Sequence, residues 1–291
     1  MKSNLMLLFA AAIWGFGFVA QRLGMNYLEP FAFNSMRFLL GALSLVPLLW
    51  LLSRKSTPTA NDHNSLKKPP LLNGGLICGL VLFVAATLQQ YGLFYTTAAK
   101  AGFITGLYLI LVPMLGIFLR HKTGMSIWVG AFLALTGLYL LSVNDNFTMS
   151  LGDSLIFIGS LFWAFHILVI DHFSGRVDPI ELSAMQFLIC GLLSSGVSLL
   201  IETPTINNIL ACWKPILFAG VVSVGIAYTL QVIAQKNANP SHAAIIMSLE
   251  AVFAAIGGVW LLDETLSPRA WFGCGLMLAG MLLSQVKFKN T

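Results

Sequence analysis

The sequence predicts an all-α membrane protein with ten transmembrane helices, arranged as an inverted repeat of two five-helix units. Of its 291 residues, 57% are hydrophobic and only 9% are charged, whereas a soluble domain carries roughly 25% charged residues. Apolar runs of about 18 to 25 residues recur along the chain, the length that an α-helix needs to cross a hydrocarbon core of roughly 30 Å. A sequence repeat, described below, predicts the two units.

Glycine, proline, asparagine, aspartate and charged residues divide the chain into ten spans. The first unit is residues 1–143, with spans at 4–21, 31–52, 73–96, 99–119 and 125–143. The second unit is residues 152–291, with spans at 152–172, 181–201, 213–235, 241–262 and 267–286. The polar stretch 53–72 contains prolines and is expected to be a flexible cytoplasmic loop.

The charges predict how the spans cross the membrane. With the N-terminus in the cytoplasm, eleven of the 16 Lys and Arg residues fall inside and four outside, and Arg37 lies within a span. This excess follows the positive-inside rule, so both termini are predicted to be cytoplasmic in a multi-pass protein of the inner (cell) membrane. The basic residues are spread over short loops, so no nucleic-acid partner is expected. The four cysteines are scattered singly, and we expect no metal and no cofactor.

Three blocks of the first unit return in the second in the same order. Trp14 matches Trp163, Thr87-Leu88-Gln89 matches Thr229-Leu230-Gln231, and Trp128-x-Gly130 with Gly137 matches Trp271-x-Gly273 with Gly280. Because each unit has an odd number of spans, the second must enter the membrane from the opposite side to the first. Many secondary transporters have this plan, with a binding site near the middle of the membrane.

Short motifs along essentially the whole chain resemble those of a known family. They are Trp14-Gly15-x-Gly17, Glu29-Pro30, Arg37-Phe38, Gly225-Ile-Ala-Tyr-Thr-Leu-Gln231, and Ser248-Leu249-Glu250 followed by Asp263-Glu264-Thr265-Leu266. Their order resembles the EamA-type branch of the drug/metabolite transporter superfamily. The resemblance implies export of small organic solutes, often amino acids or related metabolites. Members typically carry a proline just after the ninth-helix glutamate; this chain has Ala251 there, which leaves the helix geometry at Glu250 open.

Polar side chains within the spans are the candidate binding residues, because a buried polar group needs a partner or water. Glu250 has no basic residue within a helical turn, and desolvation favours its neutral form. It either exchanges a proton during transport or makes a structural hydrogen bond. Its repeat counterpart is Tyr108, which carries no charge at neutral pH. Gln89 and Gln231 are expected to point into one shared cavity, whereas Gln235 is expected to be only the cytoplasmic end of its helix.

Aromatic residues complete the main candidates, since rings facing a cavity can stack on solutes. Trp163 and His166 share a helix face, and Trp14 is the matching aromatic of the first unit. His166 either shuttles protons or donates to a backbone carbonyl.

A second set of candidates consists of Asn34, Arg37, Gln186 and Tyr228. For Arg37, snorkelling to the outer interface is favoured over contact with a ligand. Asp263 and Glu264 are expected to be solvated at the outer end of their helix.

The motifs of an enzyme are missing from the sequence. It shows no nucleophile elbow, phosphate loop, metal-ligand set or paired carboxylates. The leading hypothesis is a secondary transporter that exports small organic metabolites, such as amino acids, related compounds or drugs, by alternating access, coupled to protons or to the solute gradient alone. An importer of the same architecture and a non-transporting membrane assembly factor stay open. The expected partners are a small-molecule substrate and the lipid bilayer, and a homodimer also stays open.

Overall fold

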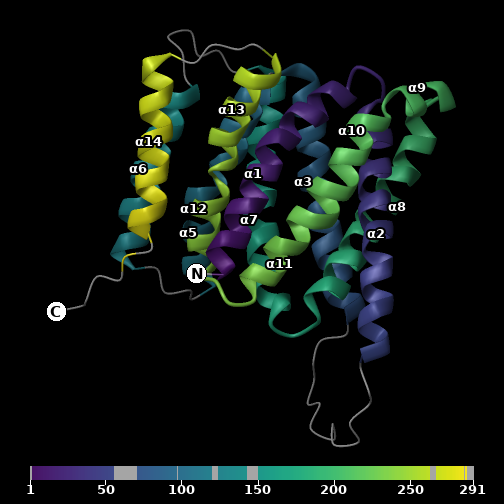
Figure 1. Cartoon of the computed structure of the whole chain (residues 1–291), viewed down its shortest axis with the longest axis horizontal. Coiled ribbons are helices and arrows are strands. Elements are labelled where there is room, and N and C mark those ends of the chain that lie inside the picture. Colours follow the sequence, from purple (N-terminus) through teal and green to yellow (C-terminus); the bar gives the residue numbers. More distant parts are fainter. Residues whose placement is uncertain are drawn as a thin grey trace, which may run out of the picture.

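The computed structural model describes residues 2–55, 71–96, 98–119, 124–142, 150–262, 267–284 and 286. Within these ranges the regular structure is helical and contains no strand. The helices stand side by side in a bundle (Figure 1). The prediction of an all-α chain is confirmed, and most of the predicted loop 53–72 lies outside the described residues.

Eight segments are long and apolar enough to cross a membrane. They are α1 (Lys2–Gly24), α2 (Pro30–Lys55), α3 (Leu71–Tyr95), α4 (Ala98–Gly106) with α5 (Tyr108–Phe118), α7 (Leu151–Ser174), α8 (Pro179–Ile201), α10 (Trp213–Leu217) with the π-helix η1 (Phe218–Tyr228) and α11 (Thr229–Gln235), and α12 (Pro240–Met247) with α13 (Glu250–Leu262). The remaining described helices are the shorter apolar α6 (Met125–Ser142), α9 (Ile206–Ala211) and α14 (Pro268–Ser284). The eight segments begin and end near the predicted boundaries, whereas the count of ten crossings stays a prediction.

Side-chain caps fix where two neighbouring helices begin. Asp178 accepts hydrogen bonds from the first backbone N–H groups of α8, as a helix start requires. The cap of α2 comes instead from the end of α8, because the Glu202 carboxylate accepts from the N–H groups of Phe31 at 2.9 Å and Ala32 at 2.7 Å. Glu202 is buried, so this contact ties the start of α2 to the end of α8.

Two of the long segments are interrupted in the middle. α4 and α5 are separated by a turn at Leu107, and α12 and α13 are separated by a turn at Ser248 and Leu249. Leu107 and Leu249 are 142 residues apart, the spacing that relates Gln89 to Gln231. α13 begins at Glu250. The helix is therefore interrupted just before this residue, although Ala251 stands where family members typically have a proline.

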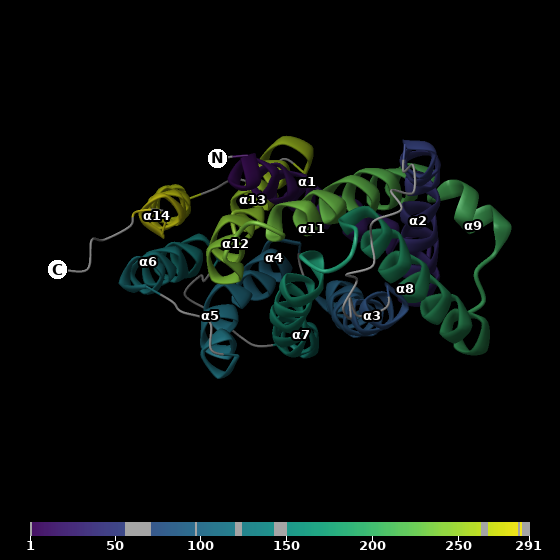
Figure 2. The same ribbon diagram turned by 90° about the horizontal axis from the view of Figure 1, so that it is seen from below.

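Glycines bring α6 and α14 into close contact. A Cβ atom added to Gly137 would lie 2.4 Å from the carbonyl oxygen of Gly273, and one added to Gly130 would lie 2.6 Å from that of Gly280. Only glycine permits such an approach of two backbones, which is the usual role of small residues between membrane helices. In Figure 2 this pair lies at one edge of the bundle, and α2, α8 and α9 lie at the opposite edge.

The start of α1 and the end of α14 lie on the same side of the bundle, the lower side in Figure 1. The ends of α1 and α3 and the start of α2 lie on the other side. Between the two edges seen in Figure 2, helices from both halves of the chain surround the cavity described next.

Candidate functional site

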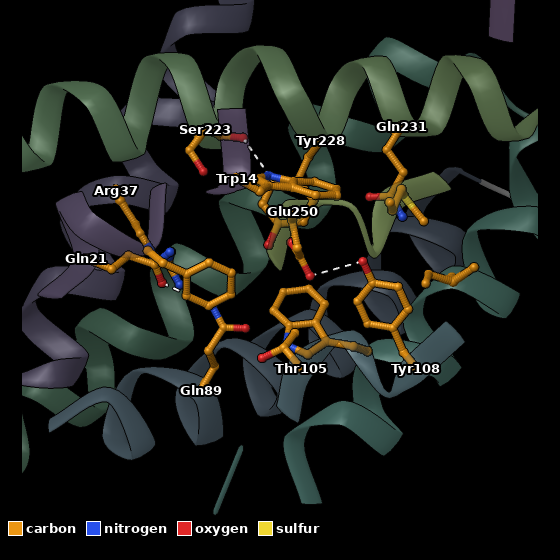
Figure 3. A pocket seen from close by; sticks show the side chains of 14 residues that line it. Trp14, Gln21, Arg37, Gln89, Thr105, Tyr108, Ser223, Tyr228, Gln231 and Glu250 are labelled. Carbon is orange, nitrogen blue, oxygen red and sulfur yellow. Dashed lines mark hydrogen bonds between the residues drawn. The ribbon is translucent and has the colours of Figure 1, made fainter. Parts of the chain in front are cut away.

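A cavity lies between the helices inside the bundle. Its walls come from α1, α2, α3, α4, α5, α7, η1, α11, α12 and α13, so both halves of the chain contribute (Figure 3). The lining residues are Trp14, Phe18, Gln21, Arg37, Gln89, Thr105, Tyr108, Trp163, Ile167, Ser223, Tyr228, Gln231, Met247 and Glu250.

Eight of the eleven sequence candidates line this cavity. Six belong to the main set and two to the second set: Trp14, Gln89, Tyr108, Trp163, Gln231 and Glu250, with Arg37 and Tyr228. The other three, His166, Gln186 and Asn34, are buried behind it. His166 Nε2 lies 2.8 Å from the Gln186 side-chain oxygen, so at this nitrogen a side chain takes the place of the backbone carbonyl, one of the two alternatives for His166.

The breaks in the two interrupted segments place Glu250 and Tyr108 together. Each is the first residue of the helix that follows its break, and the Tyr108 hydroxyl donates to a Glu250 carboxyl oxygen at 3.0 Å. Both side chains are buried and face the cavity. Two residues that lie 142 positions apart in the sequence thus contact each other directly, one a phenol and the other a carboxylic acid.

Arg37 does not reach the outer interface, so the favoured interpretation as a snorkelling residue is wrong. The side chain is 1% exposed and lines the cavity. Its Nε donates to the Asn34 side-chain oxygen at 2.9 Å, and Asn34 in turn donates to the backbone carbonyl of Ala86. The guanidinium carbon lies 4.7 Å from the centre of the Phe38 ring, a cation–π contact. These contacts hold the arginine inside the bundle.

Three aromatic rings form one wall of the cavity. Tyr228 lies between Trp14, at a centroid distance of 4.7 Å, and Trp163, at 6.0 Å with the rings nearly parallel. Trp14 Nε1 donates to the backbone carbonyl of Ser223 at 3.3 Å. Ser223 lies in η1, and π-helical turns often occur at functional sites. The wall offers flat apolar surface to a solute.

The two glutamines predicted to face a shared cavity, Gln89 and Gln231, both line it but have different partners. Gln89 donates to the side chain of Gln21 at 3.2 Å. Gln231 donates to the side chain of Gln235 at 2.8 Å, and Gln235 donates to the backbone carbonyl of Ile167. Gln235 is 2% exposed. Gln235 is the last residue of α11, as predicted, but it is more than a helix end, because it is buried and holds Gln231 in place.

Four buried polar atoms of the lining residues have no hydrogen-bond partner within the described part of the chain. They are Arg37 Nη2, Thr105 Oγ1, Trp163 Nε1 and Gln231 Oε1. Leaving a buried polar group unpaired costs free energy, so such groups are rare in stable proteins. All four belong to residues that line the one cavity, which makes it a candidate site for a polar solute.

The sequence interpretation missed six lining residues: Phe18, Gln21, Thr105, Ile167, Ser223 and Met247. Gln21 and Thr105 carried a usable signal, because each is a polar residue inside or at the end of an apolar run. The others are apolar or small and cannot be distinguished by sequence from core residues. Asp263 and Glu264, expected to be solvated, lie outside the described residues.

Comparisons with known proteins agree with a membrane transporter. The EamA-like transporter family matches the chain twice, over residues 1–143 and 150–285. An uncharacterized transporter of Archaeoglobus fulgidus is 31% identical over 98% of this chain and 86% of its own length. The uncharacterized inner membrane transporter YedA of Escherichia coli is 26% identical over 93% of this chain and 86% of its own length.

A solved crystal structure shares the fold. It superposes with a TM-score of 0.75 at 19% identity, covering 96% of this chain and 95% of that one. Two family matches that together span nearly the whole chain, a relative above 30% identity and eight apolar helical segments agree with one another. The chain belongs to the EamA-like transporter family and is a multi-pass membrane transporter.

Proposed function

We propose that the protein exports small organic metabolites, amino acids or related compounds among them, across the inner membrane by alternating access. The observation that carries the proposal is the cavity, which combines an aromatic wall with four unpaired buried polar atoms. A site with flat apolar surface and a few polar groups is what a small organic solute requires.

Helix contacts support an inverted repeat of two five-span units, 1–143 and 152–291. Contacts occur in matching pairs: α1 packs on α13 as α7 packs on α5, and α3 packs on α8 as η1 packs on α2. Gly130 meets Gly280 while Gly137 meets Gly273, so equivalent residues exchange partners between α6 and α14. Such reciprocal contacts are typical of a two-fold axis. Ten membrane crossings with both termini in the cytoplasm fit this arrangement.

The interrupted helices support alternating access. Broken helices at the middle of the membrane are a common feature of transporters, in which two repeats rock around a fixed site. Here the breaks at Leu107 and Leu249 occur at equivalent positions, directly before Tyr108 and Glu250. The contact between these two side chains would lie close to the axis of the motion.

Glu250 is the proposed proton-binding residue. It is the single carboxyl group among the described residues that line the cavity, and its hydrogen-bond partner is a hydroxyl rather than a cation. A buried carboxyl without a counter-charge is much less costly when protonated. Binding and release of a proton as the cavity opens to either side would couple transport to the proton gradient.

Transport by purified protein in liposomes tests the proposal. Radiolabelled amino acids, nucleosides and organic cations are loaded inside or outside, and flux is measured with and without a pH gradient. We expect saturable flux of at least one class. Liposomes that carry folded protein but show no flux above empty vesicles for the whole panel would contradict the proposal.

A further inference from the structure

A buried cation without a counter-charge stands out among the lining residues. The Arg37 guanidinium makes one side-chain hydrogen bond, to Asn34, while Nη2 has no partner within the described residues. No ion pair with a carboxylate is found for it in the same part of the chain. An isolated buried charge is strongly unfavourable, and the partial compensation by an amide and by the Phe38 ring is small beside that cost.

We infer that Arg37 binds the carboxylate of the transported solute. The inference rests on the proposed transport function and adds a substrate class to it: organic molecules that carry one carboxylate on an apolar body. A guanidinium matches the two oxygens of a carboxylate, and such hydrogen bonds are among the strongest in proteins.

The charge of the lining favours a single negative charge on the solute. Of the described residues around the cavity, Arg37 is the one basic side chain and Glu250 the one acidic side chain. While Glu250 is protonated, Arg37 compensates one negative charge, so a phosphate monoester with nearly two would leave one of them uncompensated. In the view of Figure 3, Tyr108 lies on the opposite side of the cavity from Arg37, and Glu250 lies between them.

The surroundings of Arg37 fit a carboxylate site. Gln21 and Gln89 line the cavity and appear on the same side of it as Arg37 in Figure 3. Asn34 occupies Nε and so fixes the guanidinium plane while leaving Nη2 free. The aromatic wall of Trp14, Tyr228 and Trp163 supplies surface for the apolar body of the same solute.

Three probes of the same shape test the inference: 3-phenylpropionate, its neutral amide and 3-phenylpropylamine. Their binding to purified full-length protein is measured by calorimetry. We expect the carboxylate to bind about tenfold or more tightly than the amide, as expected for hydrogen bonds to a charged group. Arg37→Gln should abolish this preference.

A second variant keeps the test independent of any folding defect in Arg37→Gln. Asn34→Asp places a carboxylate on the Arg37 Nε, which is 2.9 Å from the present amide oxygen. It should compete for the guanidinium and weaken 3-phenylpropionate binding while retaining the arginine. Arg22→Gln is the matched control, because Arg22 donates to the backbone carbonyl of Leu93 and does not line the cavity. It should bind all three probes as the wild type does.

The outcomes separate this inference from the proposed function. No measurable binding of 3-phenylpropionate at millimolar concentration, or an equal preference for the carboxylate in wild type and Arg37→Gln, would overturn the carboxylate site. Flux of carboxylate solutes that is unaffected by Arg37→Gln would also overturn the carboxylate site, but it would not contradict transport. Arg37-dependent binding without flux in liposomes would instead refute transport and leave the site standing.

Discussion

Among the described residues that line the cavity, one carboxyl group and one guanidinium group are buried, and they are held in opposite ways. Glu250 has a neutral partner, Tyr108, and can lose its charge by taking up a proton. Arg37 cannot lose its charge, because a guanidinium stays protonated in proteins, and it has no counter-charge within the described residues. Glu250 can therefore become neutral without a ligand, whereas Arg37 needs an anionic ligand to compensate its charge.

Of the substitutions described here, replacing Glu250 should change proton-driven flux the most. We expect Glu250→Gln to abolish flux driven by a pH gradient and to leave the protein folded, since an amide cannot exchange a proton. Flux with and without a pH gradient in liposomes measures this effect. Unchanged proton coupling in the variant would remove Glu250 from the proton pathway.

Glu202→Gln is the matched control for that experiment. Glu202 is also buried, but both of its carboxyl oxygens accept backbone hydrogen bonds at the start of α2. The variant should keep proton coupling and lose about 1.5 to 3 kcal/mol of stability, the usual range for a hydrogen bond to a charged group. Its unfolding temperature checks the second part.

A glycine that faces the start of α13 tests how closely α1 packs against that helix. A Cβ atom on Gly15 would lie 2.4 Å from the Phe253 Cβ and 2.7 Å from the Glu250 backbone oxygen. Gly15→Ala should therefore push α1 away from α13 and cost about 1 to 3 kcal/mol. The midpoint of thermal unfolding in detergent measures the cost.

Gly17→Ala separates crowding from the gain in helix propensity, which both variants share. At Gly17 the nearest atom is 3.4 Å away, so little crowding is expected. Equal unfolding temperatures for the two alanine variants would argue against close packing of α1 on α13.

Arg37→Met should leave stability unchanged or raise it, whereas Gly15→Ala should lower it. Methionine removes a buried charge whose desolvation costs several kcal/mol, while the Asn34 oxygen loses its donor at about 1 to 3 kcal/mol. We expect the unfolding temperature to stay the same or rise, and carboxylate binding to be lost. A clear fall in unfolding temperature would show that the guanidinium has a compensating partner.

Tyr108→Phe should change flux the least of these variants. It removes one hydrogen bond, worth about 1 kcal/mol, but leaves the carboxyl that binds the proton. We expect slower flux that still responds to the pH gradient. Loss of the response in this variant would mean that Tyr108 itself is needed for proton coupling.

The helices could be predicted from the sequence because membrane burial demands long apolar runs, and the boundaries of α1, α3 and α8 follow from those runs. The break before Glu250 could not be predicted in detail, since no proline marks it. The π-helical turn around Ser223 also has no sequence signal, because tertiary contacts decide such local geometry.

The candidate site could be predicted in part. The sequence singles out Glu250, Gln89 and Gln231, because a polar side chain within an apolar run is costly unless it has a partner, water or a ligand. Arg37 was misjudged because its position along α2 allows both snorkelling and burial, and only the packing of Asn34 and Phe38 around it decides between them. Gln235 was misjudged because Lys236 beside it suggests a solvated helix end.

Labelling of engineered cysteines tests most directly whether the cavity is a transport pathway. Gln89→Cys and Gln231→Cys each place a thiol on the cavity wall, and the four native cysteines are buried. With impermeant thiol reagents, we expect Gln89→Cys to react from the outside, Gln231→Cys to react from the inside, and a transported solute to slow both reactions. If both positions stay shielded from either side in folded protein, no aqueous pathway reaches the cavity and the account is wrong.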